Sequence, residues 1–371
     1  MKDCKVACFS DLHLGHKSND TLKILQCLRN EIFENKLLEE IDALFIAGDI
    51  FDRLLQLDYP GLPFIDQFFA DLLRRCKKTN TILRLLEGTP SHDRGQTSRV
   101  VTIEELIHSG CDFKYINTLQ YEYLNSLDCH VLYVPDEYKP DNAETLTEVK
   151  ELLKDRGLKQ FDIAIMHGAF GYQFPAHLKL PVHDINEYEA LVRTIIFIGH
   201  VHTHSRSGKV FAQGSFDRLR HGEEEPKGFG IAEIRNNRAN AVFIANKYAR
   251  VYKTIQLYNK DLEEAIKYLK RALANQPIDA CIRIEAEPGN PIFSNILELQ
   301  KLYPTITFTK LLKLKEESEA EAIEVVNEFN DYKATDINSS NLIELVVSKL
   351  DKQEHTSEDI EYISSQLKEL L

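Results

Sequence analysis

The sequence lacks a paired-cysteine motif, although it contains seven cysteines: Cys4, Cys8, Cys27, Cys76, Cys111, Cys129 and Cys281. Their number is odd, their spacing is scattered and no CxxC pair occurs, which argues against a disulfide framework and a zinc ribbon. We therefore expect reduced thiols in a cytoplasm. Free cysteine usually behaves as a small buried hydrophobic residue, so none of the seven is a candidate site residue.

A long apolar segment is also missing from the N-terminus. The chain opens with MKDCKVACFSD, in which the apolar run has only about five residues and is too short for a signal peptide or a membrane span. The expectation is a soluble cytoplasmic protein that makes no membrane contact.

The sequence has no obvious basic patch. Its formal net charge is −13, and residues 310–371 hold 7 lysines, no arginine and 15 acidic residues. Proteins that bind nucleic-acid phosphates usually present a basic surface. A cluster of carboxylate metal ligands would account for part of the negative charge, and bound cations would offset it. If the chain acts on DNA, we expect a partner protein to supply much of the DNA-binding affinity.

Apolar residues make up 43% of the 371 residues and charged residues 28%, which is typical of a soluble globular protein. Up to about residue 250, short β-rich apolar runs alternate with loops or helical stretches such as 21–39 and 61–77. The pattern predicts an α/β (α+β) fold in which two packed sheets are flanked by helices. The expected strands are 6–10, 43–48, 81–88, 131–136, 161–168, 194–200, 209–215, 228–234 and 241–246.

The pattern changes beyond residue 250. Residues 251–314 read as β-α-β-α-β and predict a small α+β domain, and residues 315–340 form an acidic linker. In residues 341–371, apolar positions at helical spacing predict a helical hairpin. Its apolar stripe must pack either on the chain's own domain or on a helix pair of a partner, and the sequence leaves both open.

Five of the predicted strands end in aspartate or histidine. Because ligands bind at the carboxyl ends of strands in open α/β sheets, these side chains are expected to converge. The set comprises Asp11, His13, Asp49, Ser91, His92, Asp93, His167, His200 and His202.

Aspartate and histidine without cysteine suit Mn²⁺, Zn²⁺ or Fe²⁺. In Asp11-Leu12-His13 and His200-Val201-His202, alternate positions of an extended segment place both side chains on one side. An aspartate such as Asp49, at the end of a central strand, can bridge two metals. Two metals roughly 3.5–4 Å apart can clamp a phosphate and activate a water.

This ordered set resembles the calcineurin-like metallophosphoesterase superfamily, which carries D-x-H, G-D, G-N-H-D/E, H and G-H-x-H in that order. Within the superfamily, the chain looks most like the SbcD-type DNA double-strand-break repair exonucleases. The likeness rests on SDLHLG (10–15), GDIFD (48–52) and GSFDRLRHGEEEPKGF (214–229). It implies a four-layer αββα sandwich over residues 1–250, a capping domain over 251–314 and a helical tail over 341–371.

The resemblance also implies residue roles. Asp11, His13, Asp49 and His202 would hold one divalent ion, Mn²⁺ or Mg²⁺. Asp49, His167 and His200 would hold a second, with one ligand from the third motif. His92 would be the catalytic acid that protonates the leaving 3′-oxygen, and Asp93 would orient it.

The partners implied by the resemblance are DNA, a second copy of the chain, and an SbcC-like coiled-coil ATPase gripping residues 341–371. The implied activity is 3′→5′ exonuclease action on duplex ends and endonuclease action on single strands, in DNA repair, recombination or replication. The protein would be a bacterial cytoplasmic protein, or it would be encoded by a phage and act in the cytoplasm of the host cell.

The third motif departs from the family pattern, because Gly88-Thr89-Pro90-Ser91-His92-Asp93 places Ser91 where asparagine is expected. Ser91 is therefore the predicted ligand, although a hydroxyl binds metal less well than an amide. Two further residues are candidates for substrate binding: Arg53, which follows Asp49, and His16.

Two other functions are compatible with these motifs. One is a phosphatase or small-molecule phosphodiesterase of the same superfamily, since DIFDR (49–53) echoes the D-x-x-D-R of protein phosphatases. The glycine that follows in that motif is replaced by Leu54. The other is a non-catalytic scaffold that has lost its metals.

Overall fold

The structure is a computed structural model that describes residues 1–313 except 176, 179, 275 and 278. The chain divides into two compact units, Met1–Glu285 with Gly289–Leu311, and Ala286–Pro288 with Leu312–Leu371. The predicted acidic linker and helical tail lie outside the described residues. Of the helices in the described part of the chain, none has the length and apolar character needed to span a membrane.

The first large sheet has six strands. Their order is β12 (Arg238–Ala245), β11 (Gly228–Arg235), β1 (Cys4–Phe9), β2 (Ala43–Ala47), β3 (Ile82–Leu86) and β4 (Phe113–Ile116). Strands β1 to β4 are parallel, whereas β11 and β12 run antiparallel to their neighbours. All five residues of β2 are buried, as expected for a parallel strand covered on both faces.

The second large sheet also has six strands. Their order is β5 (Gln120–Leu124), β6 (Cys129–Val134), β7 (Phe161–Gly168), β8 (Val192–His200), β10 (Val210–Ala212) and β9 (Ser205–Ser207). Strands β6, β7, β8 and β10 are parallel, and the two outer strands are antiparallel. Each large sheet is therefore mixed, with a parallel centre.

Three apolar cores separate four layers. Because side chains alternate between the faces of a strand, Leu44 and Ile46 of β2 pack in one core while Phe45 packs in the next. In β7, Ile165 shares that middle core, whereas Met166 faces a third. The middle core lies between the sheets. This arrangement confirms the predicted αββα sandwich.

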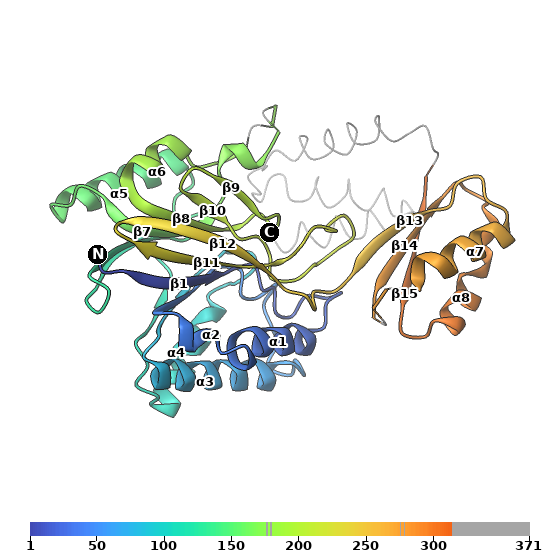
Figure 1. The fold of residues 1–371 in the computed structure, drawn as a ribbon, viewed down its shortest axis with the longest axis horizontal. Coiled ribbons are helices and arrows are strands. Elements are labelled where there is room, and N and C mark those ends of the chain that lie inside the picture. Colours follow the sequence, from blue (N-terminus) through green and yellow to red (C-terminus); the bar gives the residue numbers. More distant parts are fainter. Residues whose placement is uncertain (176, 179, 275, 278, 314–371) are drawn as a thin grey trace, which may run out of the picture. The chain divides into compact units, whose positions relative to one another are not determined.

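Helices cover the outer face of each sheet (Figure 1). On the first sheet lie α1 (Thr21–Arg29), η1 (Asn30–Glu34), α2 (Leu37–Glu40), α3 (Leu62–Thr79) and, after the short η2 (Gln96–Ser98), α4 (Arg99–Ile107). On the second lie α5 (Asn142–Asp155) and, beyond η3 (Gly171–Gln173), α6 (Ile185–Leu191). The stripe Ile65, Phe68, Phe69, Leu72 and Cys76 of α3 is fully buried, which the helical spacing of these residues explains.

A smaller three-stranded sheet follows the sandwich. It consists of β13 (Tyr252–Gln256), β14 (Cys281–Ala286) and β15 (Thr307–Leu312), with α7 (Leu262–Leu273), η4 (Pro291–Asn295) and α8 (Ile296–Leu302) between them. The β-α-β-α-β order matches the pattern predicted for residues 251–314. Whether this part caps the sandwich domain stays a prediction.

Candidate metal centre

Polar side chains gather at the carboxyl ends of strands from both large sheets. Three of these strands, β1, β2 and β3, belong to the first sheet, and β7 and β8 belong to the second. The predicted ligands Asp11, His13, Asp49, His167, His200 and His202 fall into groups that are able to hold a metal ion.

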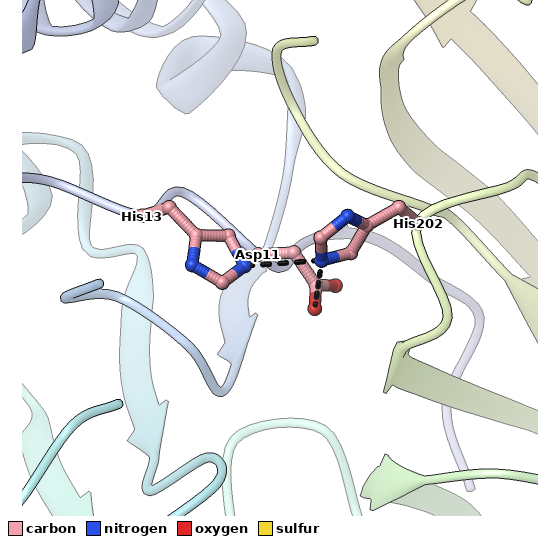
Figure 2. A group of neighbouring side chains, drawn as sticks. All are labelled: Asp11, His13 and His202. Carbon is pink, nitrogen blue, oxygen red and sulfur yellow. Dashed lines mark hydrogen bonds and ion pairs between the residues drawn. The ribbon is translucent and has the colours of Figure 1, made fainter. Parts of the chain in front are cut away.

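Asp11, His13 and His202 form the first group, and their side chains point toward one another in Figure 2. The Nε2 atoms of the two histidines are 3.1 Å apart, and Nε2 of His202 is 3.9 Å from Oδ1 of Asp11. Two nitrogens that bind one ion at ~2.1 Å with a near-right angle between them would be ~3.0 Å apart. The spacing of these nitrogens thus fits a shared cation.

Asp49, His167 and His200 form the second group. Nε2 of His167 lies 3.3 Å from Oδ1 of Asp49. The other ring nitrogen of His167 donates to the carbonyl oxygen of Ala47 at 2.6 Å, so Nε2 is the nitrogen that faces the group and can bind a metal ion when the ring is neutral. Holding the second nitrogen in this way is how proteins orient metal-binding histidines.

Asp49 faces both groups. While Oδ1 is close to His167 in the second group, Oδ2 lies 3.8 Å from Nε2 of His13 in the first. The carboxylate is almost completely buried. Burial works against its ionisation, but the charge and hydrogen bond of His167 and the charge of His13 prevail and lower the pKa of Asp49.

Several of these residues have an unusual backbone conformation. Asp11, His13, Asp49 and His200 have φ angles of 51°, 47°, 49° and 94°. A non-glycine residue in such a region costs roughly 1–3 kcal/mol and persists only where the surroundings impose it. Here adjoining loops impose it, because the N–H of His13 donates to the carbonyl of Asp49 at 3.0 Å. Strain concentrated at one spot is typical of functional sites.

Gly48 allows the second sheet to approach the first at this point. Its φ is +81°, and a Cβ at this position would lie 2.2 Å from Nδ1 of His167. Any larger residue would push His167 away from Asp49.

The ring of His202 is held from behind by Glu223, whose Oε1 lies 3.1 Å from Nδ1. Burial opposes ionisation of Glu223, but hydrogen bonds from His202 and from the backbone N–H of Leu219, together with the charge of Lys227, lower its pKa to about 2. The pKa of His202 is raised although burial lowers it, because Glu223 and Asp11 favour the charged form. Such carboxylate–histidine pairs fix the ring of a metal ligand.

The structure differs from the sequence prediction at the third motif. Ser91 is exposed. The side chain that enters the second group is Thr89, whose Oγ1 lies 3.2 Å from Nδ1 of His200. The turn after β3 directs Thr89 inward, because the N–H of Thr89 donates to Oδ1 of Asp49 at 2.7 Å.

Asp93 is fully buried, and its two oxygens accept from the backbone N–H groups of Phe51 and Gly88 at 2.8 and 2.7 Å. Burial, followed by the charges of Asp49 and Glu87, raises the pKa of Asp93 well above its usual range. Asp93 therefore braces the loops after β2 and β3. The predicted role of orienting the His92 ring belongs instead to the carbonyl of Asp52, which accepts from Nδ1 of His92 at 2.8 Å.

His92 lies beside the first group. Together with His13 and Asp52 it forms a third set of close ligand-type atoms, and its ring centre is 4.9 Å from that of His13. Since Nδ1 donates to a carbonyl, Nε2 is the atom free to accept or release a proton.

Sequence reasoning missed Asp136, whose Oδ2 lies 3.3 Å from Nδ1 of His200. It follows β6, whose neighbour in the sheet is β7. The signal was present, because the predicted strand 131–136 also ends in aspartate.

The structure places the two predicted substrate-binding residues differently. His16 is half-buried, and its pKa is lowered mainly by burial, with opposing contributions from Asp52 and Glu223. It therefore lies within electrostatic reach of the site. Arg53 is half-buried and its carbonyl accepts from Gln96 at 2.9 Å. Within the described part of the chain, no hydrogen bond or ion pair ties its guanidinium to the metal ligands.

A cavity of about 520 Å³ opens beside the centre, and its lining includes His200, His202, Arg220 and His221. Arg220 is largely exposed, with 80% of its side chain accessible. Guanidinium groups are well suited to bind phosphate oxygens.

The chain matches no family model and no curated protein. Among solved structures, that of TT1561 from Thermus thermophilus is 11% identical and covers 65% of this chain and 99% of its own, with a TM-score of 0.39. A second solved structure is 14% identical with the same coverage and TM-score. Likenesses this distant support no statement about family or activity.

Proposed function

We propose that this protein is a two-metal phosphodiesterase that cleaves DNA. The observation that carries the proposal is the position of Asp49, whose carboxylate oxygens face His13 of one ligand group and His167 of the other. A carboxylate shared in this way is the arrangement that places two cations at the separation needed to clamp one phosphate.

The donor set supports divalent cations. Its charged and imidazole members are aspartates and histidines, and two of the histidines are held through their second nitrogen, His202 by Glu223 and His167 by the carbonyl of Ala47. We expect two ions, Mn²⁺ or Mg²⁺, because the carboxylates suit both and the sequence resemblance implies the same ions. Bound there, the ions would polarise the phosphate and activate a water.

His92 supplies the proton in this proposal. Its Nδ1 is engaged by the carbonyl of Asp52, so the protonated ring presents Nε2–H to the leaving oxygen of a phosphodiester. General acid catalysis contributes roughly 10²–10⁴-fold to a rate. His16, which lies within electrostatic reach of the site, and Arg220, which lines the cavity beside it, are the candidates for contact with substrate phosphates.

The choice of DNA rests on the sequence resemblance to SbcD-type exonucleases, as do the 3′→5′ exonuclease and single-strand endonuclease activities. The same holds for the homodimer and for the coiled-coil ATPase that would bind residues 341–371. The net charge of −13 suggests that the isolated chain binds DNA weakly, so the partner would supply affinity.

The test compares the wild type with His92→Ala on end-labelled duplex DNA, single-stranded circular DNA and p-nitrophenyl phosphate, each with Mn²⁺ or EDTA. His108→Asn is the matched control, because His108 is exposed, caps α4 in a left-handed conformation that asparagine tolerates, and lies in none of the ligand groups. We expect Mn²⁺-dependent DNA cleavage by the wild type and the control, reduced by roughly 10²–10⁴-fold in His92→Ala.

Hydrolysis of the monoester with intact DNA would replace this proposal by a phosphatase. Equal DNA cleavage by wild type and His92→Ala would remove His92 from the mechanism.

A further inference from the structure

Asp136 uses both of its carboxylate oxygens at the edge of the second ligand group. Its side chain is only 13% exposed. Oδ1 accepts from the backbone N–H of Glu137 at 3.0 Å, while Oδ2 lies 3.0 Å from Oγ1 of Thr89 and 3.3 Å from Nδ1 of His200. The turn after β6 thus fixes one oxygen and directs the other toward the site.

The hydroxyl of Thr89 has four close neighbours in the same group. Its Oγ1 lies 3.0–3.4 Å from Oδ2 of Asp136, Nδ1 of His200, Oδ2 of Asp49 and Nε2 of His167. In an octahedral site with bonds of ~2.1 Å, each ligand atom has four neighbours at ~3.0 Å. The distances to Oδ2 of Asp136, Nδ1 of His200 and Nε2 of His167 fit those between ligands of one ion, while Oδ2 of Asp49 also faces His13 of the first group.

When the His167 ring is neutral, this group holds more hydrogen-bond acceptors than donors. The two carboxylates accept only, and Nε2 of His167 also accepts when the ring is neutral, because its Nδ1–H is given to Ala47. A hydroxyl carries a single proton. A cation balances this excess of acceptors, and the charge of two carboxylates favours one.

We infer that Asp136 is a ligand of the second metal site, where it takes the place of the amide that the third motif lacks, with the hydroxyl of Thr89 beside it. The inference rests on the proposed function only in that the site takes a divalent cation. A second carboxylate beside Asp49 makes this site more negative than an amide would, which favours the hard ions Mn²⁺ and Mg²⁺.

The test is calorimetric titration of the EDTA-treated full chain with Mn²⁺, with bound Mn²⁺ counted independently by electron paramagnetic resonance. Asp136→Asn is nearly isosteric, but if its single carbonyl oxygen keeps the bond to Glu137 N–H, its amide N–H groups face the cation. Glu137→Gln is the matched control, because it removes the same charge from an exposed neighbour. Asp136→Ala serves as a second variant.

Loss of a group that only orients a metal ligand lowers affinity by roughly 10–100-fold, so loss of a ligand should cost at least as much. We expect two Mn²⁺ per chain in the wild type and in Glu137→Gln. In Asp136→Asn and Asp136→Ala, one affinity should fall by roughly 10–100-fold or more and the other should stay unchanged.

Unchanged affinities for both ions in the Asp136 variants would overturn the inference, as would a wild type that takes up only one Mn²⁺. The proposed function has a separate readout. Wild-type protein that binds two Mn²⁺ but cleaves no phosphodiester would refute the function and leave the ligand assignment standing. DNA cleavage by the wild type together with unchanged Mn²⁺ affinity in Asp136→Asn would support the function and refute the assignment of Asp136 as a ligand.

Discussion

His13 and His202 are 189 residues apart in the sequence, yet their Nε2 atoms lie 3.1 Å from each other. Two unprotonated ring nitrogens repel at this distance, so a proton or a cation must lie between them. The nearby carboxylate of Asp11 adds negative charge and favours the cation. The fold therefore holds the two histidines in an arrangement that metal binding stabilises.

Metal addition should raise the melting temperature of the protein. An ion that binds only the folded state at 100 times its Kd adds roughly 2.7 kcal/mol to the free energy of unfolding. Calorimetric melting of EDTA-treated protein with and without Mn²⁺ measures this, and His202→Ala should reduce the increase. A melting temperature that does not respond to Mn²⁺ would contradict a metal centre.

Replacing Thr89 should weaken metal binding, whereas replacing Ser91 should not. Thr89→Val keeps the shape of the side chain but removes the hydroxyl that lies 3.3 Å from Oδ2 of Asp49. Ser91 is exposed, so Ser91→Ala is the control. Mn²⁺ affinities of the two variants, measured by calorimetric titration, distinguish them, and the reverse pattern would restore Ser91 as the ligand.

Glu223→Gln should lower the affinity of the first ion. Glu223 holds the His202 ring through Nδ1, and loss of such a carboxylate partner typically lowers metal affinity by roughly 10–100-fold. Glu225→Gln is a control of similar chemistry, because Glu225 pairs with Lys227 and not with His202. Equal Mn²⁺ affinity in both variants would show that the ring needs no such support.

His183 should make the protein less stable in acid. Its ring is buried, Nδ1 has no hydrogen-bond partner among the described residues, and burial lowers its pKa to about 4. In the unfolded chain the His183 ring binds a proton with a pKa near 6.5. The folded state therefore loses stability relative to the unfolded state as the pH falls from about 6.5 toward about 4. At pH 5 the loss is about 2 kcal/mol.

The variant His183→Phe tests this pH dependence, because a phenyl ring can pack on Phe170 and Tyr188 as the imidazole does. Urea unfolding at pH 7 and pH 5 gives the free energies. The wild type should lose about 2 kcal/mol more than the variant between these two pH values. If the free energy of unfolding fell equally in the wild type and in His183→Phe, a residue other than His183 would cause the acid sensitivity.

Much of the fold was predictable from the sequence because the central strands are parallel and buried on both faces. Their continuous apolar runs, such as Ala43–Ala47, leave a clear signal. Less regular elements leave no such signal in the sequence. Strand β4 was not predicted, because three of its four residues are only half-buried. The clustering of the candidate ligands at strand ends was predictable because each lies next to its strand in the sequence.

The third motif was harder to read, because the inward direction of a side chain in a turn depends on contacts between distant segments. Thr89 points inward since its N–H binds Asp49, 40 residues away. Asp136 joins the group only because β6 lies next to β7 in the sheet. Local spacing does not encode the direction of Thr89, and the aspartate that ends the predicted strand 131–136 points to the site only once the order of the strands is known.

Cleavage of end-labelled duplex DNA and single-stranded circular DNA by EDTA-treated protein, titrated with Mn²⁺, tests the central claim most directly. Asp49→Asn is the informative variant, because Asp49 faces both ligand groups. The account predicts that cleavage by the wild type appears only as two Mn²⁺ bind and that Asp49→Asn loses both cleavage and second-ion binding. DNA cleavage that persists in EDTA, or full activity in Asp49→Asn, would contradict it.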